Sequence, residues 1–167
     1  HGTLAVLEAE MLRPDKTQMI SIETSSHLPG AEPGYGPVVR QGDRMGIFDT
    51  QMVEWIAGVA KKSKLPFQKR VMDGGTCEAS AFGLYGFKVG GLSTPLLNYH
   101  NITTAQKAMP EAVDTGDVEH LQKLISQIIH ANEKKPGLQK FWGTFSAMKK
   151  KLLKNHKMHL KYFLLPF

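Results

Sequence analysis

Two side chains that can bind a metal ion or move a proton each follow an apolar segment. Glu23 is the second-last residue of the alternating segment 18–24, which precedes a loop rich in proline and glycine, and His100 comes just after the apolar run 89–97. In open α/β sheets, ligands collect at the carboxyl ends of the strands. Imidazole is the commonest metal ligand and a base near neutral pH, and carboxylates share both roles. Glu and His at loop positions are more often solvated surface groups, so the pattern alone leaves both interpretations open.

A third candidate is the stretch Gly74, Gly75, Thr76 and Cys77, which follows the apolar segment 67–72. Two glycines before a helix allow a ligand to approach the backbone closely. Amides at a helix N-terminus favour an anion, such as a substrate carboxylate or a developing oxyanion. The stretch lacks the spacing and the lysine of a phosphate-binding loop. Cys77 has no activating neighbour in the sequence, which favours a small core thiol over a nucleophile.

These residues need strands and helices to position them, and hydrophobic periodicity predicts such elements. Four segments read as strands, the first of which contains Glu23 near its end, and Asp49 is a plausible N-cap for an amphipathic helix. A long helix near residue 115 has Thr115 or Asp117 as its cap. The predicted helices are 2–11, 49–64, 76–86, 113–132 and 138–161, and the predicted strands are 18–24, 37–40, 67–72 and 89–97.

Strands that alternate with helices predict an α/β fold, a three-layer sandwich with a mostly parallel sheet flanked by helices. A length of 167 residues favours one domain, and 41% hydrophobic with 22% charged residues is typical of a globular chain. The single cysteine excludes an internal disulfide framework and a four-cysteine zinc site, and fits a reducing compartment such as the cytoplasm. No apolar stretch approaches the ~18 residues that predict a membrane span.

The net charge of +6 comes from the end of the chain. Residues 134–167 hold nine lysines and no acidic residue, whereas the preceding residues carry 15 acidic and 12 basic side chains. Phe141, Phe145, Met148 and Leu152 share one face of the last predicted helix. We therefore expect residues 1–133 to form the main domain, and 134–167 a lysine-rich helical tail that docks on it or on a second copy through this apolar row. The tail lacks the aromatic interleaving of a single-strand binder, which disfavours nucleic acid as a partner.

Several segments in order resemble the co-catalytic dinuclear zinc aminopeptidases, the group of tetrahedral and deblocking aminopeptidases and so-called endoglucanase-M. Gly74-Gly75-Thr76 resembles the family motif that opens a helix, and Tyr99-His100 resembles the aromatic-x-His tail that supplies a zinc ligand. The strand that ends in Glu23 is similar to the segment that supplies a carboxylate ligand. The resemblance covers about residues 1–133 and implies the C-terminal part of a metallopeptidase catalytic domain.

The resemblance also implies roles. Glu23 and His100 would each bind one of two zinc ions, with cobalt or manganese as possible replacements, and residues 74–77 would recognise the substrate end. In the complete enzyme the metals would activate a bridging water for attack on an N-terminal peptide bond, with a carboxylate as base. This chain has Glu23 where the family usually has Asp, and Cys77 where an acidic residue usually follows the Gly-Gly-Thr motif.

The remaining family ligands and the catalytic glutamate lie upstream of the matched segment, so no catalytic residue is expected in this chain. We expect the isolated chain to be inactive, and the complete protein to be a homo-oligomer that acts on peptides. Two alternatives stay open. One is a non-catalytic α/β interaction module whose basic tail binds an acidic partner. The other is a related zinc amidohydrolase or deacetylase, since those enzymes share the two-metal core and accept a glutamate at the position of Glu23.

Overall fold

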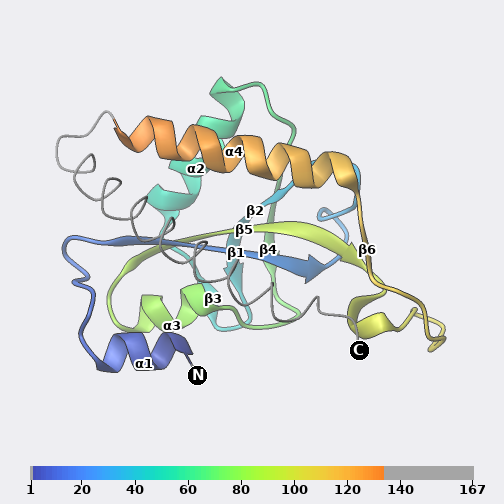
Figure 1. Cartoon of the computed structure of the whole chain (residues 1–167), viewed down its shortest axis with the longest axis horizontal. Helices are drawn as coiled ribbons and strands as arrows, with labels where there is room; N and C mark the ends of the chain where they lie inside the picture. Colours follow the sequence, from blue (N-terminus) through green and yellow to red (C-terminus); the bar gives the residue numbers. More distant parts are fainter. Residues whose placement is uncertain (1, 134–167) are drawn as a thin grey trace, which may run out of the picture. The chain divides into compact units, whose positions relative to one another are not determined.

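The computed structural model describes residues 2–133 (Figure 1). The chain divides into two compact units, His1–Ile128 and Ile129–Phe167. The fold below is that of the first unit, and the described part of the second is the end of the last helix. The predicted helix 138–161 and its docking lie outside the described residues. The elements are α1 (Gly2–Glu8), β1 (Gln18–Ser26), β2 (Val38–Asp43), β3 (Gly46–Ile47), α2 (Thr50–Lys62), β4 (Gln68–Met72), α3 (Glu78–Leu84), β5 (Lys88–Leu97), a 3-10 turn (Tyr99–Asn101), β6 (Ala112–Val113) and α4 (Thr115–Glu133).

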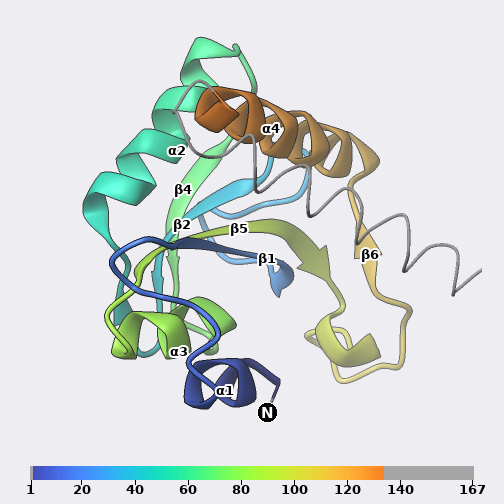
Figure 2. The ribbon, with the colours of Figure 1, turned by 60° about the vertical axis from the view of Figure 1, so that its left-hand side comes forward.

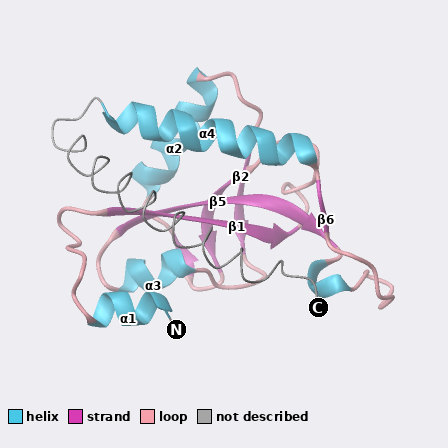
Figure 3. Ribbon diagram, in the orientation of Figure 1, coloured by secondary structure: helices cyan, strands magenta, loops and turns pink. Residues whose placement is uncertain are grey.

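The six strands form one sheet with the order β1-β5-β2-β3, in which β4 also pairs with β2 and β6 with β5. The two longest pairings, β1 with β5 and β2 with β4, are parallel. The pairings of β2 with β5, β2 with β3 and β5 with β6 are antiparallel. Helices α2 and α4 cover one face and α1 and α3 the other (Figures 2 and 3). The expected α/β sandwich, a sheet flanked by helices, is confirmed.

β5 is the central strand, and all but its two end residues are buried. Helices cover both faces of the sheet, so the strand reads as a continuous run of apolar and small residues without alternation. A Cβ atom at Gly90 would lie 2.8 Å from Ile56 Cδ1, so this strand needs a glycine where α2 crosses it. The close approach lets α2 bury Met52, Val53 and Ile56 against the sheet.

Two helix starts test the predicted caps. At α2 the prediction is confirmed, because the Asp49 carboxylate accepts a hydrogen bond from the Met52 N–H at 2.7 Å. At α4 the predicted caps, Thr115 and Asp117, are wrong, because the Asp114 carboxylate accepts from the Asp117 N–H at 3.0 Å. The buried Asp117 side chain instead accepts the N–H groups of Gly34 and Gly36, at 2.8 and 2.7 Å. It thereby ties the proline- and glycine-rich loop to α4.

Candidate functional site

A pocket of about 250 Å³ lies where β1 ends and the loop after β4 begins. It brings together residues that are far apart in the sequence, including Glu23, the Gly-Gly-Thr motif and Tyr99. Its lining combines polar and apolar side chains, which can hold a small ligand or a peptide end. The lining residues are Glu23, Thr24, Ser25, Ser26, Leu28, Arg40, Met72, Gly74, Gly75, Thr76 and Tyr99.

Glu23 lies inside β1, which continues to Ser26, and not at the strand end that the sequence suggested. Its side chain is 32% exposed and its Oε1 atom forms an ion pair with Arg40. The Ser25 hydroxyl donates a second hydrogen bond to the same oxygen, at 3.2 Å. Both contacts use Oε1, which leaves Oε2 as the oxygen available to a metal ion or a ligand.

Arg40 is the charged residue of the pocket that sequence reasoning missed. It is only 2% exposed, and its guanidinium carbon lies 5.9 Å from the centre of the Phe48 ring, within range of a cation–π contact. Its position in a short apolar strand was an available signal, because a buried arginine needs a charged partner. The Arg40 Nε atom and the buried Ser93 hydroxyl make no hydrogen bond within residues 2–133.

His100 lies in the 3-10 turn after β5 and is exposed to solvent. Its ring stacks on the Tyr99 ring with 4.0 Å between the ring centres, and the backbone N–H of His100 donates to the Glu111 carboxylate at 2.8 Å. The φ angle of His100 is +63°, a left-handed conformation that is uncommon outside glycine. Tyr99 lines the pocket and His100 does not. The imidazole thus lies against Tyr99, a residue of the pocket wall.

The motif Gly74-Gly75-Thr76 lines the pocket, and Cys77 lies behind it with 8% exposure. The Cys77 N–H, expected to favour a substrate anion, already donates to the Asp43 carboxylate at 2.8 Å. The thiol belongs to the hydrophobic core, as expected for a structural cysteine. Any recognition of a ligand by this loop therefore falls to the three residues before Cys77.

Asp43 is buried at the end of β2 and was not predicted as a functional residue. Burial by itself raises the pKa of the Asp43 carboxyl, but hydrogen bonds from the Ser80 hydroxyl and from the Cys77 and Met45 N–H groups outweigh it and hold the pKa below its ordinary value. Asp43 is therefore ionised at neutral pH. The sequence carried no signal for this residue, because the predicted strand 37–40 ends before Asp43 and the pairing of β2 with β4 exists only in the fold.

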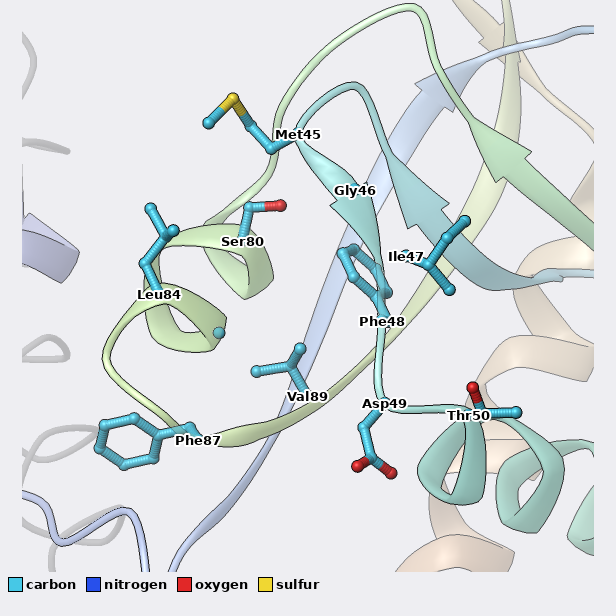
Figure 4. A pocket seen from close by; sticks show the side chains of 11 residues that line it. Met45, Gly46, Ile47, Phe48, Asp49, Thr50, Ser80, Leu84, Phe87 and Val89 are labelled. Atoms are coloured by element: carbon cyan, nitrogen blue, oxygen red, sulfur yellow. The ribbon is translucent and has the colours of Figure 1, made fainter.

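A second pocket, of about 420 Å³, lies between β3, α3 and the start of β5 (Figure 4). Its floor is apolar and its rim carries Met45, Ile47 and Leu84, whose side chains are 62–75% exposed. None of the residues predicted to bind metal or substrate lines it. The only hydroxyl groups among its lining residues belong to Thr50 and Ser80.

Two of the described residues are candidate ligands for a metal centre. Glu23 and His100 are donors of types that zinc binds. Within residues 2–133, however, no three His, Cys, Asp or Glu side chains are grouped so that they could hold one ion. These residues alone do not fit a complete metal centre, and further ligands from outside them are required. No helix of the described part is long and apolar enough to cross a membrane.

The model of one protein family, the M42 glutamyl aminopeptidases, matches residues 8–124. The fold is also similar to that of solved structures, of which three are described here. An aminopeptidase from the archaeon Desulfurococcus kamchatkensis is 22% identical with a TM-score of 0.57, and the match covers 75% of this chain and 36% of that one. An endoglucanase from Thermotoga maritima is 21% identical with a TM-score of 0.51, with coverage of 75% and 36%.

The third structure is the TET1 peptidase of Pyrococcus horikoshii, which can assemble into a tetrahedron or a large octahedral shell. It is 23% identical with a TM-score of 0.51, and the match covers 66% of this chain and 32% of that one. The chain thus spans about a third of the length of the structures it matches. At these TM-scores and identities, the likeness shows a shared fold.

Proposed function

Because the chain belongs to the M42 glutamyl aminopeptidase family, we propose that it forms part of the catalytic domain of a metal-dependent aminopeptidase. The observation that carries this proposal is the meeting of Glu23, the Gly-Gly-Thr motif and Tyr99 at one pocket inside the family match. These segments are separated by about 50 and 25 residues in the sequence, and only the fold brings them together.

Glu23 and His100 are the two metal ligands that we assign to this chain, one for each of two zinc ions, with cobalt or manganese as possible replacements. When bound, the metal pair supplies a hydroxide at neutral pH for attack on a peptide carbonyl. Glu23 would bind through Oε2, since Arg40 and Ser25 hold Oε1. Partners that orient a ligand in this way are a regular feature of metal sites. The ligands that complete each ion, and the catalytic base, come from outside residues 2–133.

The Gly74-Gly75-Thr76 loop is assigned to the substrate. It forms one wall of the pocket that holds Glu23, so a peptide bound there lies next to the proposed ligand. Two residues without Cβ atoms leave the backbone open to a peptide end. A Cβ atom added at Gly74 or Gly75 would meet nothing within 4 Å, so the surface above this loop is open.

The complete protein is proposed to be a homo-oligomer that acts on peptides. The similar peptidase of Pyrococcus horikoshii assembles into closed shells, which supports this proposal. The single cysteine fits a reducing compartment, and we place the protein in the cytoplasm.

The test measures the release of p-nitroaniline from aminoacyl p-nitroanilides, with added zinc, cobalt or manganese. The protein is the form that contains this chain together with the segments that complete the metal centre. Glu23→Ala and His100→Ala should each lower kcat/KM by about 100-fold or more, since a ligand is lost from the site. Glu119→Ala and His120→Ala on α4 are the matched controls and should leave kcat/KM unchanged. An inactive parent protein, or equal effects in both pairs, contradicts the proposal.

The isolated 167-residue chain is a second arm of the same test. Two donors from separate segments cannot fix a two-metal centre, so this chain should show no turnover with any of the three metals. Metal-dependent turnover that His100→Ala abolishes would show that the chain itself carries a complete site.

A second candidate function rests on Glu23, which replaces the aspartate usual at this position. A side chain longer by one methylene is compatible with related zinc amidohydrolases and deacetylases. Substrate profiling separates the two candidates. Hydrolysis of N-acetylated amino acids in preference to aminoacyl p-nitroanilides would favour the amidohydrolase.

A further inference from the structure

The buried carboxylate of Asp43 connects three segments around the glycine motif. Its Oδ1 atom accepts the Met45 N–H at 2.8 Å, from the turn that leads to β3. Its Oδ2 atom accepts the Cys77 N–H at 2.8 Å and the Ser80 hydroxyl at 2.6 Å, both at the start of α3. One side chain therefore joins the end of β2, the β2–β3 turn and α3. Figure 4 shows Ser80 on α3 and Met45 just before β3.

The geometry follows from the pairing of the strands. β2 and β4 are parallel, and Asp43 lies opposite Met72, the last residue of β4. The glycine motif starts two residues after Met72, so its loop leaves the sheet beside Asp43. The backbone adds a direct link, since the Arg44 N–H donates to the Gly75 carbonyl at 3.0 Å.

Asp43 also replaces a missing helix cap. Cys77 is the N-cap residue of α3, and its side chain makes no capping hydrogen bond. The aspartate supplies the acceptor from a neighbouring strand, and its negative charge is favourable at a helix N-terminus. The start of α3, and with it the end of the glycine loop, is therefore fixed by a residue 34 positions earlier in the chain.

We infer that Asp43 is a positioning residue of the proposed aminopeptidase, and that it holds the Gly74-Gly75-Thr76 loop in the conformation that receives the substrate end. This inference rests on the proposed function. It adds a residue that is neither a proposed metal ligand nor a member of the pocket lining, and it assigns the effect of that residue to substrate binding.

Asp43→Asn is the direct test because it changes one atom. Both carboxylate oxygens accept from N–H or O–H donors, so the asparagine amide must place its NH2 group against at least one donor. Ser80→Ala removes one of the three hydrogen bonds and leaves the carboxylate with its two backbone donors, so its effect should be smaller. Asp49→Ala is the matched control, since it removes a cap from α2 and leaves the glycine loop untouched.

The first readout is amide hydrogen exchange in the 167-residue chain, which needs no activity. Asp43→Asn should speed exchange by about tenfold at Met45, Cys77 and the first turn of α3, the factor that matches one lost hydrogen bond. Exchange in α2 and α4 should stay unchanged. Unaltered exchange around the loop overturns the inference, and so does equal acceleration in all helices, which would indicate general destabilisation.

The second readout is the split between KM and kcat in the active protein. A displaced binding loop raises KM with little change in kcat, whereas partial unfolding lowers apparent kcat and leaves KM unchanged. Asp43→Asn should raise KM about fivefold to tenfold, and Asp49→Ala should not. An unchanged KM in an active protein overturns the inference. If the parent protein hydrolyses no aminoacyl substrate, the proposed function fails, and the exchange experiment alone decides whether Asp43 holds the loop.

Discussion

Arg40 reaches across the central strand to pair with Glu23. The two residues lie on β2 and β1, which are not neighbours, because β5 runs between them. Gly91 is the residue of β5 that pairs with Arg40 in the sheet, and a Cβ atom there would lie 3.1 Å from Arg40 Cδ. The absence of a side chain at Gly91 therefore gives the arginine its path. The buried Arg40 can therefore reach Glu23, the proposed metal ligand, only because residue 91 has no side chain.

The first prediction concerns the charge on Glu23. Glu23→Gln keeps the size of the side chain but leaves the buried Arg40 without a counter-charge, which should lower the free energy of unfolding by about 1–3 kcal/mol. Exchanging Arg40 for methionine in the same chain should recover part of this loss, because the uncompensated charge is removed. Urea unfolding at pH 7 measures both. The control is Glu119→Gln, which breaks the exposed pair with Lys123 and should change stability by less than about 0.5 kcal/mol. Equal losses at Glu23 and Glu119 would contradict the prediction.

The second prediction concerns the path at Gly91. Gly91→Val would crowd Phe48 and Arg40, whose nearest atoms are 3.0 and 3.1 Å from the added Cβ, and overpacking of this kind should cost about 1–3 kcal/mol. Because it displaces Arg40, its loss should be less than additive with that of Glu23→Gln. Gly90→Ala is the control on the opposite face, where it meets Ile56 and Met52. Its loss should add to that of Glu23→Gln within about 0.5 kcal/mol, as is usual for independent sites. If the losses of both Gly91→Val and Gly90→Ala add to that of Glu23→Gln, the prediction is contradicted.

Local patterns in the sequence were sufficient for the long elements. The alternation ending at Glu23 predicted β1, and the apolar row after Asp49 predicted α2 together with its cap. The strands β3 and β6 were missed because each has two residues and exists only through pairing with a partner strand. The cap of α4 was misassigned because three acceptors, Asp114, Thr115 and Asp117, lie within four residues and only tertiary contacts choose among them.

Some residues of the candidate site could be identified from local sequence patterns and others could not. Glu23 and the glycine motif were identified from residue types next to apolar segments, and the fold places them at one pocket. Arg40 and Asp43 were missed, because Glu23, which pairs with Arg40, and Cys77 and Ser80, which donate to Asp43, lie 17 or more residues away in the sequence. Burial is what makes these two charges informative, and burial is a property of the assembled sheet.

The third prediction tests how well α2 tolerates a better helix former. Gly58 lies inside α2 on its exposed side, and a Cβ atom there would meet nothing within 4 Å. Gly58→Ala should therefore raise the free energy of unfolding by about 0.5–1 kcal/mol, since alanine restricts the unfolded chain without strain in the helix. Thermal unfolding followed by circular dichroism measures the change.

Gly36→Ala is the same substitution at a position where it should destabilise the protein. Gly36 has φ +91°, and an added Cβ would lie 2.4 Å from the Pro66 carbonyl oxygen. The left-handed backbone alone costs a non-glycine residue about 1–2 kcal/mol, so this variant should unfold at a lower temperature. A shift in the same direction for both glycines would contradict the argument from local geometry.

The last prediction concerns the contribution of the Asp43 carboxyl to the pH dependence of the free energy of unfolding. The pKa of its carboxyl is lowered in the folded protein from an ordinary value of 3.8, mainly by the hydrogen bonds from Ser80, Cys77 and Met45 against the opposing effect of burial. A lowered folded pKa means that the unfolded chain binds the proton first, so the stabilisation is present above the ordinary value and is lost as the pH falls through the folded value. The free energy of unfolding of the parent chain should therefore exceed that of Asp43→Asn by a constant amount above about pH 5, and the gap should narrow below about pH 4. Urea titrations of both chains between pH 7 and pH 3 measure the gap, and the subtraction removes the contributions of the other carboxylates. A gap that stays constant to pH 3 would show that the ionised form of Asp43 is not what stabilises the loop, and a gap that widens in acid would reverse the sign of the argument.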